Sequence, residues 1–410
     1  MSVVQQTVEP EEGAERRQRA RVGGVRKLRT RDDFDRDVWS VLGMPVDRAT
    51  PPSAVDAIRL AARDNERLSI VTPNVNFLVR SHIDNAERRA ILNADLSLAD
   101  GAPIALLARI LGLRDAERVA GADVFEALRR DAAFSSRRLS VFFFGGRDGA
   151  ARAAAEKITA ENRGLISAGY LNPGHGDLDS MSTEEIIGEI NTADPDFVVV
   201  SLGASKGQAW IERNKDRLNA PVISHLGAVV DFTAGTISRA PTAWRRMGLE
   251  WAWRIKEEPS LATRYWRDGR ALISILATRL GPALLSGRVK RVNEPAAAQV
   301  TPMGEATEIR LSGDLVDGAL DPVRRSFRGA ALAGGPVILE FTKAGAIDAA
   351  FLGQVLMLEK ALGRVEKPIK VRGGEKKLRR LLAAHGLVYE EAGSASPNES
   401  EAVPGIAAAG

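Results

Sequence analysis

The chain has 410 residues, a net charge of +4 and 27% charged residues, and its hydrophobic fraction of 44% is enough to bury the cores of two or three domains. It contains no cysteine, which excludes a disulfide scaffold, a thiolate zinc site and a cysteine nucleophile. Its four histidines are not spaced as metal ligands, and no run of ~20 apolar residues occurs, so we expect neither a metal site nor a membrane-spanning helix.

Residues 1–38 are highly charged and poor in hydrophobic side chains, which is typical of a disordered tail. Residues 16–31 hold eight Arg or Lys and no acid, and no apolar segment of a secretion signal follows them. This basic run is either simply solvated or attracted to an anionic membrane surface, where each basic residue adds up to ~1 kcal/mol. No nucleic-acid-binding motif accompanies it, so we expect no nucleic-acid partner.

Residues 39–235 alternate short apolar runs with helix-length segments, which predicts an α/β domain. We expect strands at Leu68–Val71, Leu96–Leu98, Leu139–Phe144, Leu165–Tyr170, Phe197–Leu202 and Val222–Leu226. Helices are expected at Asn85–Asn93, Ala150–Asn162 and Thr183–Thr192. Strands that are apolar on both faces predict a Rossmann-like, mostly parallel sheet covered on both sides. Because such sheets bind ligands beyond the carboxyl ends of their strands, the polar residues there are the site candidates.

The rest of the chain has a different composition. Residues 236–291 form a basic, helical appendage with four of the six tryptophans, and residues 292–305 read as a linker. A small α/β domain is expected at 306–392, followed by a disordered tail at 393–410. In that domain we expect strands at Glu308–Leu311, Val337–Phe341 and Ile369–Val371, and helices at Ala349–Leu362 and Lys376–His385.

Two groups of polar residues follow the first strands. Thr72 and Asn74 come after one strand and Asp100 after the next, so a hydroxyl, an amide and a carboxylate could surround a sugar, with the carboxylate as a base. These residue types are also common in ordinary turns. Arg118 lies five residues before Asp123, which makes Asp123 a candidate helix N-cap or, alternatively, leaves Arg118 to bind a diphosphate.

Two later strand ends offer further candidates. Gly145 and Gly146 let backbone N–H groups approach a phosphate, although a complete dinucleotide motif is absent. Lys206 and Gln208 begin the next helix, where Lys206 faces either solvent or phosphate and Gln208 is a candidate to bond uracil or sugar.

The stretch from residue 227 to 254 combines Asp231 and several arginines with three tryptophans. An unpaired charge is costly in a core, and tryptophan is of little use in a solvated loop. Arginine with tryptophan therefore indicates a surface that meets an anionic, partly apolar partner such as a lipid headgroup or a diphosphate. Asp231, Arg239 and Arg254 are the candidates here, and Arg264 is a further candidate in the basic segment that follows.

These segments, in this order, resemble one protein family. TPNVN, ADGAPIALLARILG, RVAGAD, FFFGG, SLGASKGQAWI, GAVVDFTAG, RAP and GLEWAWR match the signature of the WecG/TagA/CpsF glycosyltransferases over roughly residues 39–270. The resemblance implies an inverting transferase, without cofactor or metal, that moves a sugar such as N-acetylmannosamine from a UDP-sugar to an undecaprenyl-diphosphate-linked acceptor. Such enzymes act at the cytoplasmic face of the membrane in surface polysaccharide synthesis.

The resemblance also implies residue roles. Asp100 matches the family's proposed base, Thr72 and Asn74 match its T-x-N motif, and Arg118 matches the arginine of its R-V-x-G motif. The basic segment from 239 to 270 corresponds to an appendage that covers the site and contacts membrane.

Two departures from the family pattern concern the donor subsite. The family usually reads Gly-x-Pro-Lys-Gln-Glu-x-Trp, whereas this chain has Ser205, Gly207 and Gln208 in place of Pro, Gln and Glu. The later Glu-Pro-x-Arg-Leu pattern lacks its arginine after Glu258. We expect either another nucleotide sugar or reduced activity, and a weakened transferase that serves as a scaffold is the alternative function.

The string VILEFTKAGAIDAAFLGQVLMLEKAL resembles a STAS domain, the fold of anti-sigma-factor antagonists. In regulatory members a phosphorylated Ser or Thr follows the aspartate, but here Asp348 is followed by Ala349 and Ala350. We therefore expect this domain to dock a protein partner or the neighbouring domain without a phosphorylation switch at that position.

Overall fold

The computed structural model describes residues 28–130, 138–286, 291–363 and 367–393. The predicted tails therefore lie outside the described residues up to 27 and from 394 onward. The contacts between residues divide the chain into two compact units, and the segments of the two units alternate along the sequence. Unit 1 comprises the chain up to Asp32 with Asp47–Leu106 and Asp115–Leu272, and unit 2 comprises Asp33–Val46, Leu107–Arg114 and the chain from Ile273.

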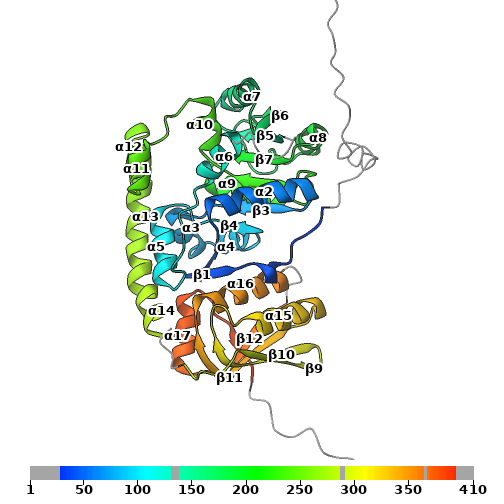
Figure 1. Cartoon of the computed structure of the whole chain (residues 1–410), viewed down its shortest axis with the longest axis vertical. Coiled ribbons are helices and arrows are strands. Elements are labelled where there is room, and N and C mark those ends of the chain that lie inside the picture. The colour runs from blue at the N-terminus through cyan, green and yellow to red at the C-terminus, as the bar shows by residue number, and fades with distance from the viewer. Residues whose placement is uncertain (1–27, 131–137, 287–290, 364–366, 394–410) are drawn as a thin grey trace, which may run out of the picture. The chain divides into compact units, whose positions relative to one another are not determined.

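Unit 1 is built on a six-stranded sheet in the order β4-β3-β8-β7-β5-β6, in which all neighbours are parallel (Figure 1). The strands are β3 (Leu68–Val71), β4 (Leu96–Ser97), β5 (Leu139–Gly145), β6 (Leu165–Leu171), β7 (Phe197–Ser201) and β8 (Val222–His225). All six strands predicted from the apolar runs are present, with ends within two residues of those expected. The expectation of a parallel α/β sheet is confirmed.

Helices cover both faces of this sheet because its strands are apolar on both sides. One core contains side chains of α2 (Pro51–Asp64), α6 (Gly121–Arg130), α7 (Ala150–Glu161) and α10 (Val229–Ala234). The core of the opposite face contains side chains of α8 (Glu184–Ala193) and α9 (Ala204–Asn214). Helices α3 (Val75–Ser81) and α4 (Asn85–Leu92) lie between β3 and β4 in the sequence.

The chain after α10 is helical, as the composition predicted. Its helices are α11 (Thr242–Arg246), α12 (Glu250–Glu257), α13 (Leu261–Ile275), the π-helical turn η2 (Leu276–Leu280) and α14 (Gly281–Ser286). Helix α5 (Ala102–Ile110) follows β4. Within the described part of the chain, no helix combines the length and the apolar character needed to cross a bilayer.

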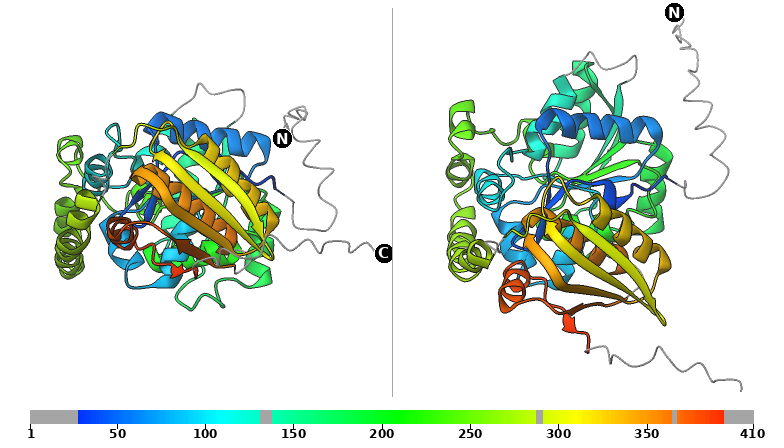
Figure 2. Two further views of the ribbon diagram at one scale, coloured as in Figure 1. Left: turned by 90° about the horizontal axis from the view of Figure 1, so that it is seen from below. Right: turned by 60° about the horizontal axis from the view of Figure 1, so that its bottom comes forward.

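Unit 2 contains a five-stranded sheet in the order β13-β12-β11-β10-β9. Its strands are β9 (Ala297–Met303), β10 (Ala306–Leu315), β11 (Val337–Ile347), β12 (Ile369–Arg372) and β13 (Glu390–Glu391), and only β9 runs antiparallel to its neighbour. Helices α15 (Asp321–Ala333) and α16 (Ala349–Gly363) pack on one face, and α17 (Lys376–Ala384) follows β12 (Figure 2).

A short N-terminal segment completes unit 2. It contains η1 (Asp33–Asp35), β1 (Val38–Val41) and β2 (Met44–Asp47). The expectation of a disordered tail up to residue 38 is corrected here for residues 28–38, because Phe34 is buried against Phe327 and Asp33 pairs with Lys360 in the interior of the unit. Helix α16 is consequently covered on a second side, and 12 of its 15 residues are buried.

Candidate functional site

The carboxyl ends of β3 and β4 bring the first predicted group together. The N–H of Asp100 donates to the carbonyl of Pro73 at 3.0 Å, and the N–H of Val119 donates to the carbonyl of Ala99 at 2.8 Å. A Cβ at Gly121 would lie 3.0 Å from the Cγ2 of Thr72, so only glycine lets helix α6 begin this close to the strand end. Thr72, Asp100 and the segment of Arg118 therefore lie close together at these strand ends.

Asn74 has a structural role that the sequence left open. It is the N-cap of α3, and its Oδ1 accepts hydrogen bonds from the N–H groups of Asn76 and Phe77 at 3.0 and 3.4 Å. The neighbouring Asn76, which we did not single out, donates from Nδ2 to Asp268 of α13 at 2.9 Å. Its place in the TPNVN motif was the available signal.

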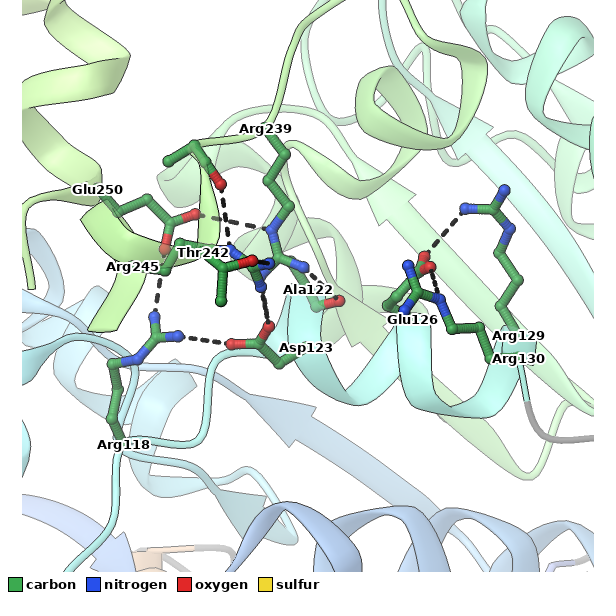
Figure 3. A network of polar contacts seen from close by, with 11 residues as sticks. Arg118, Ala122, Asp123, Glu126, Arg129, Arg130, Arg239, Thr242, Arg245 and Glu250 are labelled. Carbon is green, nitrogen blue, oxygen red and sulfur yellow. Dashed lines mark hydrogen bonds and ion pairs between the residues drawn. The ribbon is translucent and has the colours of Figure 1, made fainter. Parts of the chain in front are cut away.

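Asp123 is the centre of a network of arginines (Figure 3). It accepts hydrogen bonds from Arg118 at 2.6 Å, Arg239 at 2.8 Å and Arg245 at 2.9 Å. It lies inside the first turn of α6, so the N-cap alternative is wrong. A carboxylate in a first helical turn is also favoured by the helix dipole.

Glu250 of α12 is the second acid of this network. It accepts a hydrogen bond from Arg118 at 3.2 Å and lies 3.8 Å from the Nε of Arg239. Asp123, Arg245 and Glu250 were missed as site residues by the sequence analysis. The local sequence could not single out Arg245 and Glu250, because their partners Asp123 and Arg118 lie more than 100 residues away.

The carboxyl group of Asp100 has unusual acidity. Burial raises the pKa of Asp100 to about 7, and the neighbouring negative charges of Glu250 and Asp123 act in the same direction. Arg118 and Arg239 oppose this effect. A carboxyl group with a pKa near neutrality is suited to accept a proton during a reaction.

The two glycines after β5 are explained by conformation. Gly145 and Gly146 have φ values of 89° and 95°, and the N–H of Gly146 donates to the carbonyl of Ser201 at 2.7 Å. The backbone N–H of Arg147 is bonded to the carboxyl group of Asp231. Of the two glycines expected to let N–H groups approach a phosphate, Gly146 thus has its own N–H already engaged within the protein.

Asp231 is a buried anchor of this turn. Burial raises its pKa, and the backbone N–H of Arg147 opposes that rise. The side chain of Arg147 forms an ion pair with Glu258, which lies between α12 and α13. This pair ties the turn after β5 to the basic appendage within unit 1.

The residues at the start of α9 have separate environments. Lys206 is on the exposed side, and its Nζ donates to the carbonyl of Gly176 at 2.7 Å. Gln208 is only 4% exposed, and its Nε2 donates to the carbonyl of Ala90 at 3.3 Å. Gln208 therefore packs beneath α4 and does not lie on the surface beside Lys206.

Arg254 and Arg264 make aromatic contacts. The guanidinium of Arg254 lies 5.9 Å from the centre of the Phe232 ring, and that of Arg264 lies 5.2 Å from the Tyr265 ring. In the ranges that the structure covers, neither forms an ion pair, which distinguishes them from Arg239 in the network. Over the same ranges, no group of three or more His, Asp or Glu residues is arranged as a metal site.

Comparisons with known proteins agree with the resemblance. The sequence profile described as the glycosyl transferase WecG/TagA/CpsF family matches residues 39–283, more than half of the chain. A curated relative from Bacillus spizizenii (strain ATCC 23059 / NRRL B-14472 / W23), N-acetylglucosaminyldiphosphoundecaprenol N-acetyl-beta-D-mannosaminyltransferase, is 28% identical over 197 residues. That match covers 48% of this chain and 74% of the relative.

Among solved structures, SsGBP in complex with GDP matches with 12% identity and a TM-score of 0.20, over 62% of this chain and 90% of the other. A GTP-binding protein from the hyperthermophilic archaeon Sulfolobus solfataricus in complex with GDP matches with 13% identity and a TM-score of 0.18, over 61% and 89%. Because the family profile matches more than half of the sequence, the chain is a glycosyltransferase that belongs to the WecG/TagA/CpsF family.

Proposed function

We propose that this protein is an inverting transferase that moves a sugar, of the N-acetylmannosamine type or a related hexose, from a UDP-sugar to an undecaprenyl-diphosphate-linked acceptor. The relative from Bacillus is named for transfer of N-acetylmannosamine to such an acceptor. The product would be an intermediate of a bacterial exopolysaccharide or surface polysaccharide. The observation that carries the mechanism is the carboxyl group of Asp100, whose pKa is raised to about 7 by burial and, to a smaller extent, by the negative charges of Glu250 and Asp123.

In the proposed reaction, the acceptor hydroxyl attacks the anomeric carbon of the donor sugar and its proton passes to Asp100. The bond between the anomeric carbon and the diphosphate breaks at the same time, and its electron pair leaves with UDP. Arg118 and Arg239 would stabilise the departing diphosphate. Thr72 and Asn74 would position the sugar, and Lys206 remains a donor-side candidate.

An acceptor that is linked to a membrane lipid would bring the enzyme to the inner face of the cell membrane. Helices α11 to α13 present Trp244, Met247, Trp251 and Trp266, which are 36%, 61%, 48% and 71% exposed. Exposed aromatic side chains beside arginines suit the interface of an anionic membrane. Arg254 and Arg264 would meet the phosphates of the lipid carrier there.

For the C-terminal part of the chain, we propose a STAS-like domain at residues 306–392 that docks a protein partner. The carboxylate of Asp348 accepts hydrogen bonds from the N–H groups of Ala350 and Phe351, at 3.0 and 3.1 Å, and so caps α16. Because β1 packs against α16, a partner would have to use another face of the domain.

The function is tested by sugar transfer from UDP-N-acetylmannosamine, UDP-glucose and UDP-glucuronic acid to lipid-linked acceptors in a membrane extract. We expect Asp100→Asn to reduce kcat by ~10²–10⁴-fold, since a general base contributes about that much. Asp56→Asn, an exposed substitution on α2, is the matched control and should leave turnover unchanged.

Equal inactivity of the wild type and Asp100→Asn with every donor, together with no UDP binding, would instead support the alternative function. In that case the domain would be a scaffold in a polysaccharide assembly complex. The departure at Gly207 and Gln208 is the observation that favours this alternative.

A further inference from the structure

Gly207 is the main departure from the family motif, and the structure gives a local reason for it. The residue lies in the first turn of α9, and a Cβ built on it would overlap the imidazole of His225, at 2.8 Å from Nε2 and 2.9 Å from Cγ. Real Cβ atoms do not approach other atoms this closely. A side chain at position 207, such as the family's glutamine, is therefore incompatible with His225 as it stands.

His225 is the last residue of β8, the strand between β3 and β7. Its ring is 7% exposed and lies between two glycines, because a Cβ at Gly227 would also be 3.2 Å from its Cε1. The next residue, Leu226, packs under Gly121 together with Thr72. The imidazole thus lies in the row of strand ends that holds the proposed site.

The ring nitrogen Nε2 of His225 is buried and has no hydrogen-bond partner among the described residues. The same is true of the Oε1 of Gln208, the residue after Gly207. Burial lowers the pKa of His225 to about 4, so the ring is neutral at pH 7. A buried polar atom without a partner is destabilising, so each such atom calls for a specific explanation.

We propose that Gly207 and His225 form one coupled pair that selects the donor of the proposed transfer reaction, on which this inference rests. The imidazole takes the volume that a side chain at position 207 would need, and its Nε2 hydrogen-bonds an uncharged polar group of the nucleotide sugar. A neutral imidazole suits a hydroxyl or an amide, whereas the diphosphate requires cationic groups. The glycine then marks an altered donor site and not a lost one.

The role of the nitrogen is tested with His225→Phe, which keeps a ring and removes the hydrogen-bonding atoms. We expect the ratio of kcat/KM between two accepted UDP-sugars to change about tenfold, mainly through KM. His225→Asn retains a donor and an acceptor and should recover part of that ratio. His175→Phe, at an exposed position, is the control.

Binding of UDP alone identifies the group that is bonded. Weaker UDP binding by His225→Phe would assign the contact to the nucleoside, and unchanged UDP binding with altered donor choice would assign it to the sugar. A donor ratio that stays at the wild-type value in His225→Phe would overturn the assignment of the nitrogen.

The coupling is tested by a double-mutant cycle of Gly207→Gln and His225→Gly. We expect Gly207→Gln alone to lower the melting temperature and turnover, and the double variant to recover both, because the smaller residue admits the glutamine. Simple addition of the two effects would overturn the coupled pair. Melting temperatures can be measured without turnover, so the cycle tests the packing of Gly207 against His225 even if the wild type transfers no sugar. A wild type that transfers no sugar would count against the proposed function alone.

Discussion

The acidity of Asp100 is set by residues that reach it from three parts of the chain. Its own strand end provides burial, α6 contributes Asp123, and α12 contributes Glu250. Arg118 and Arg239 partly offset the two negative charges. An aspartate at the end of a strand therefore gains a pKa suited to a base only through the fold around it.

This arrangement predicts the pH dependence of catalysis. A base must be deprotonated, so kcat/KM should rise with pH through about 7, the pKa of Asp100, and level off above it. Glu250→Gln removes a negative charge that raises this pKa and releases Arg118, so the rising limb should move to lower pH. The measurement is the pH profile of kcat/KM for both enzymes.

Glu257→Gln provides the control for that shift. Glu257 is an exposed residue of the same helix and should leave the profile unchanged. If the rising part of the pH profile stayed in place in Glu250→Gln, or moved to higher pH, the assignment of Asp100 as the titrating group would be contradicted.

At the scale of helices and strands, the sequence predicted the sheet of unit 1 well. Strands such as Phe197–Ser201 are buried along their whole length, and a continuous apolar run reports that directly. The network around Asp123 was not predictable in the same way. Hydrophobic periodicity says which face of α6 is buried, but it cannot say which distant arginines meet its first turn.

The exposed face of α12 and α13 leads to a prediction of membrane association. Trp266 is 71% exposed, and an interfacial tryptophan stabilises binding to a bilayer surface. We expect Trp266→Gln to weaken binding to vesicles that contain anionic lipid about tenfold, a change that corresponds to ~1.4 kcal/mol. Co-sedimentation with such vesicles measures the effect.

Two controls accompany this experiment. Tyr170→Gln changes a 43% exposed aromatic residue on β6 and should leave vesicle binding as it is. Vesicles of neutral lipid should bind the wild type more weakly, because the basic residues of the appendage contribute through anionic headgroups. Equal losses in Trp266→Gln and Tyr170→Gln would argue against a specific membrane-facing surface.

For the whole molecule, the division into units could not be obtained from chain order. The sequence placed residues 39–235 in one domain, yet Asp33–Val46 belongs by contact to the unit of the C-terminal sheet. The reason is that α16 is buried around most of its circumference and must be covered on more than one side. Gly353 allows the backbone of Val38 to approach this helix, a contact between residues more than 300 positions apart.

A buried ion pair between this segment and α16 predicts how much unit 2 depends on it. Lys360 has a fully buried side chain and donates to Asp33 at 2.6 Å, and Arg36 pairs with the same carboxylate at 3.1 Å. Asp33→Asn removes the negative charge that both cations share, which should lower the free energy of unfolding by ~3–5 kcal/mol. Lys360→Met should cost less, because Asp33 keeps Arg36.

Denaturant unfolding measures the loss of stability in each variant, and hydrogen exchange of the α16 amides shows whether that loss lies in unit 2. Arg328→Met, which breaks the exposed pair with Asp35, is the control and should change stability by less than ~1 kcal/mol. If Asp33→Asn were as mild as the control, the N-terminal segment would contribute little to unit 2. A large loss in Asp33→Asn, confined to the exchange of unit 2, would instead establish residues 33–46 as part of its core, since the shared carboxylate lies at the centre of that contact.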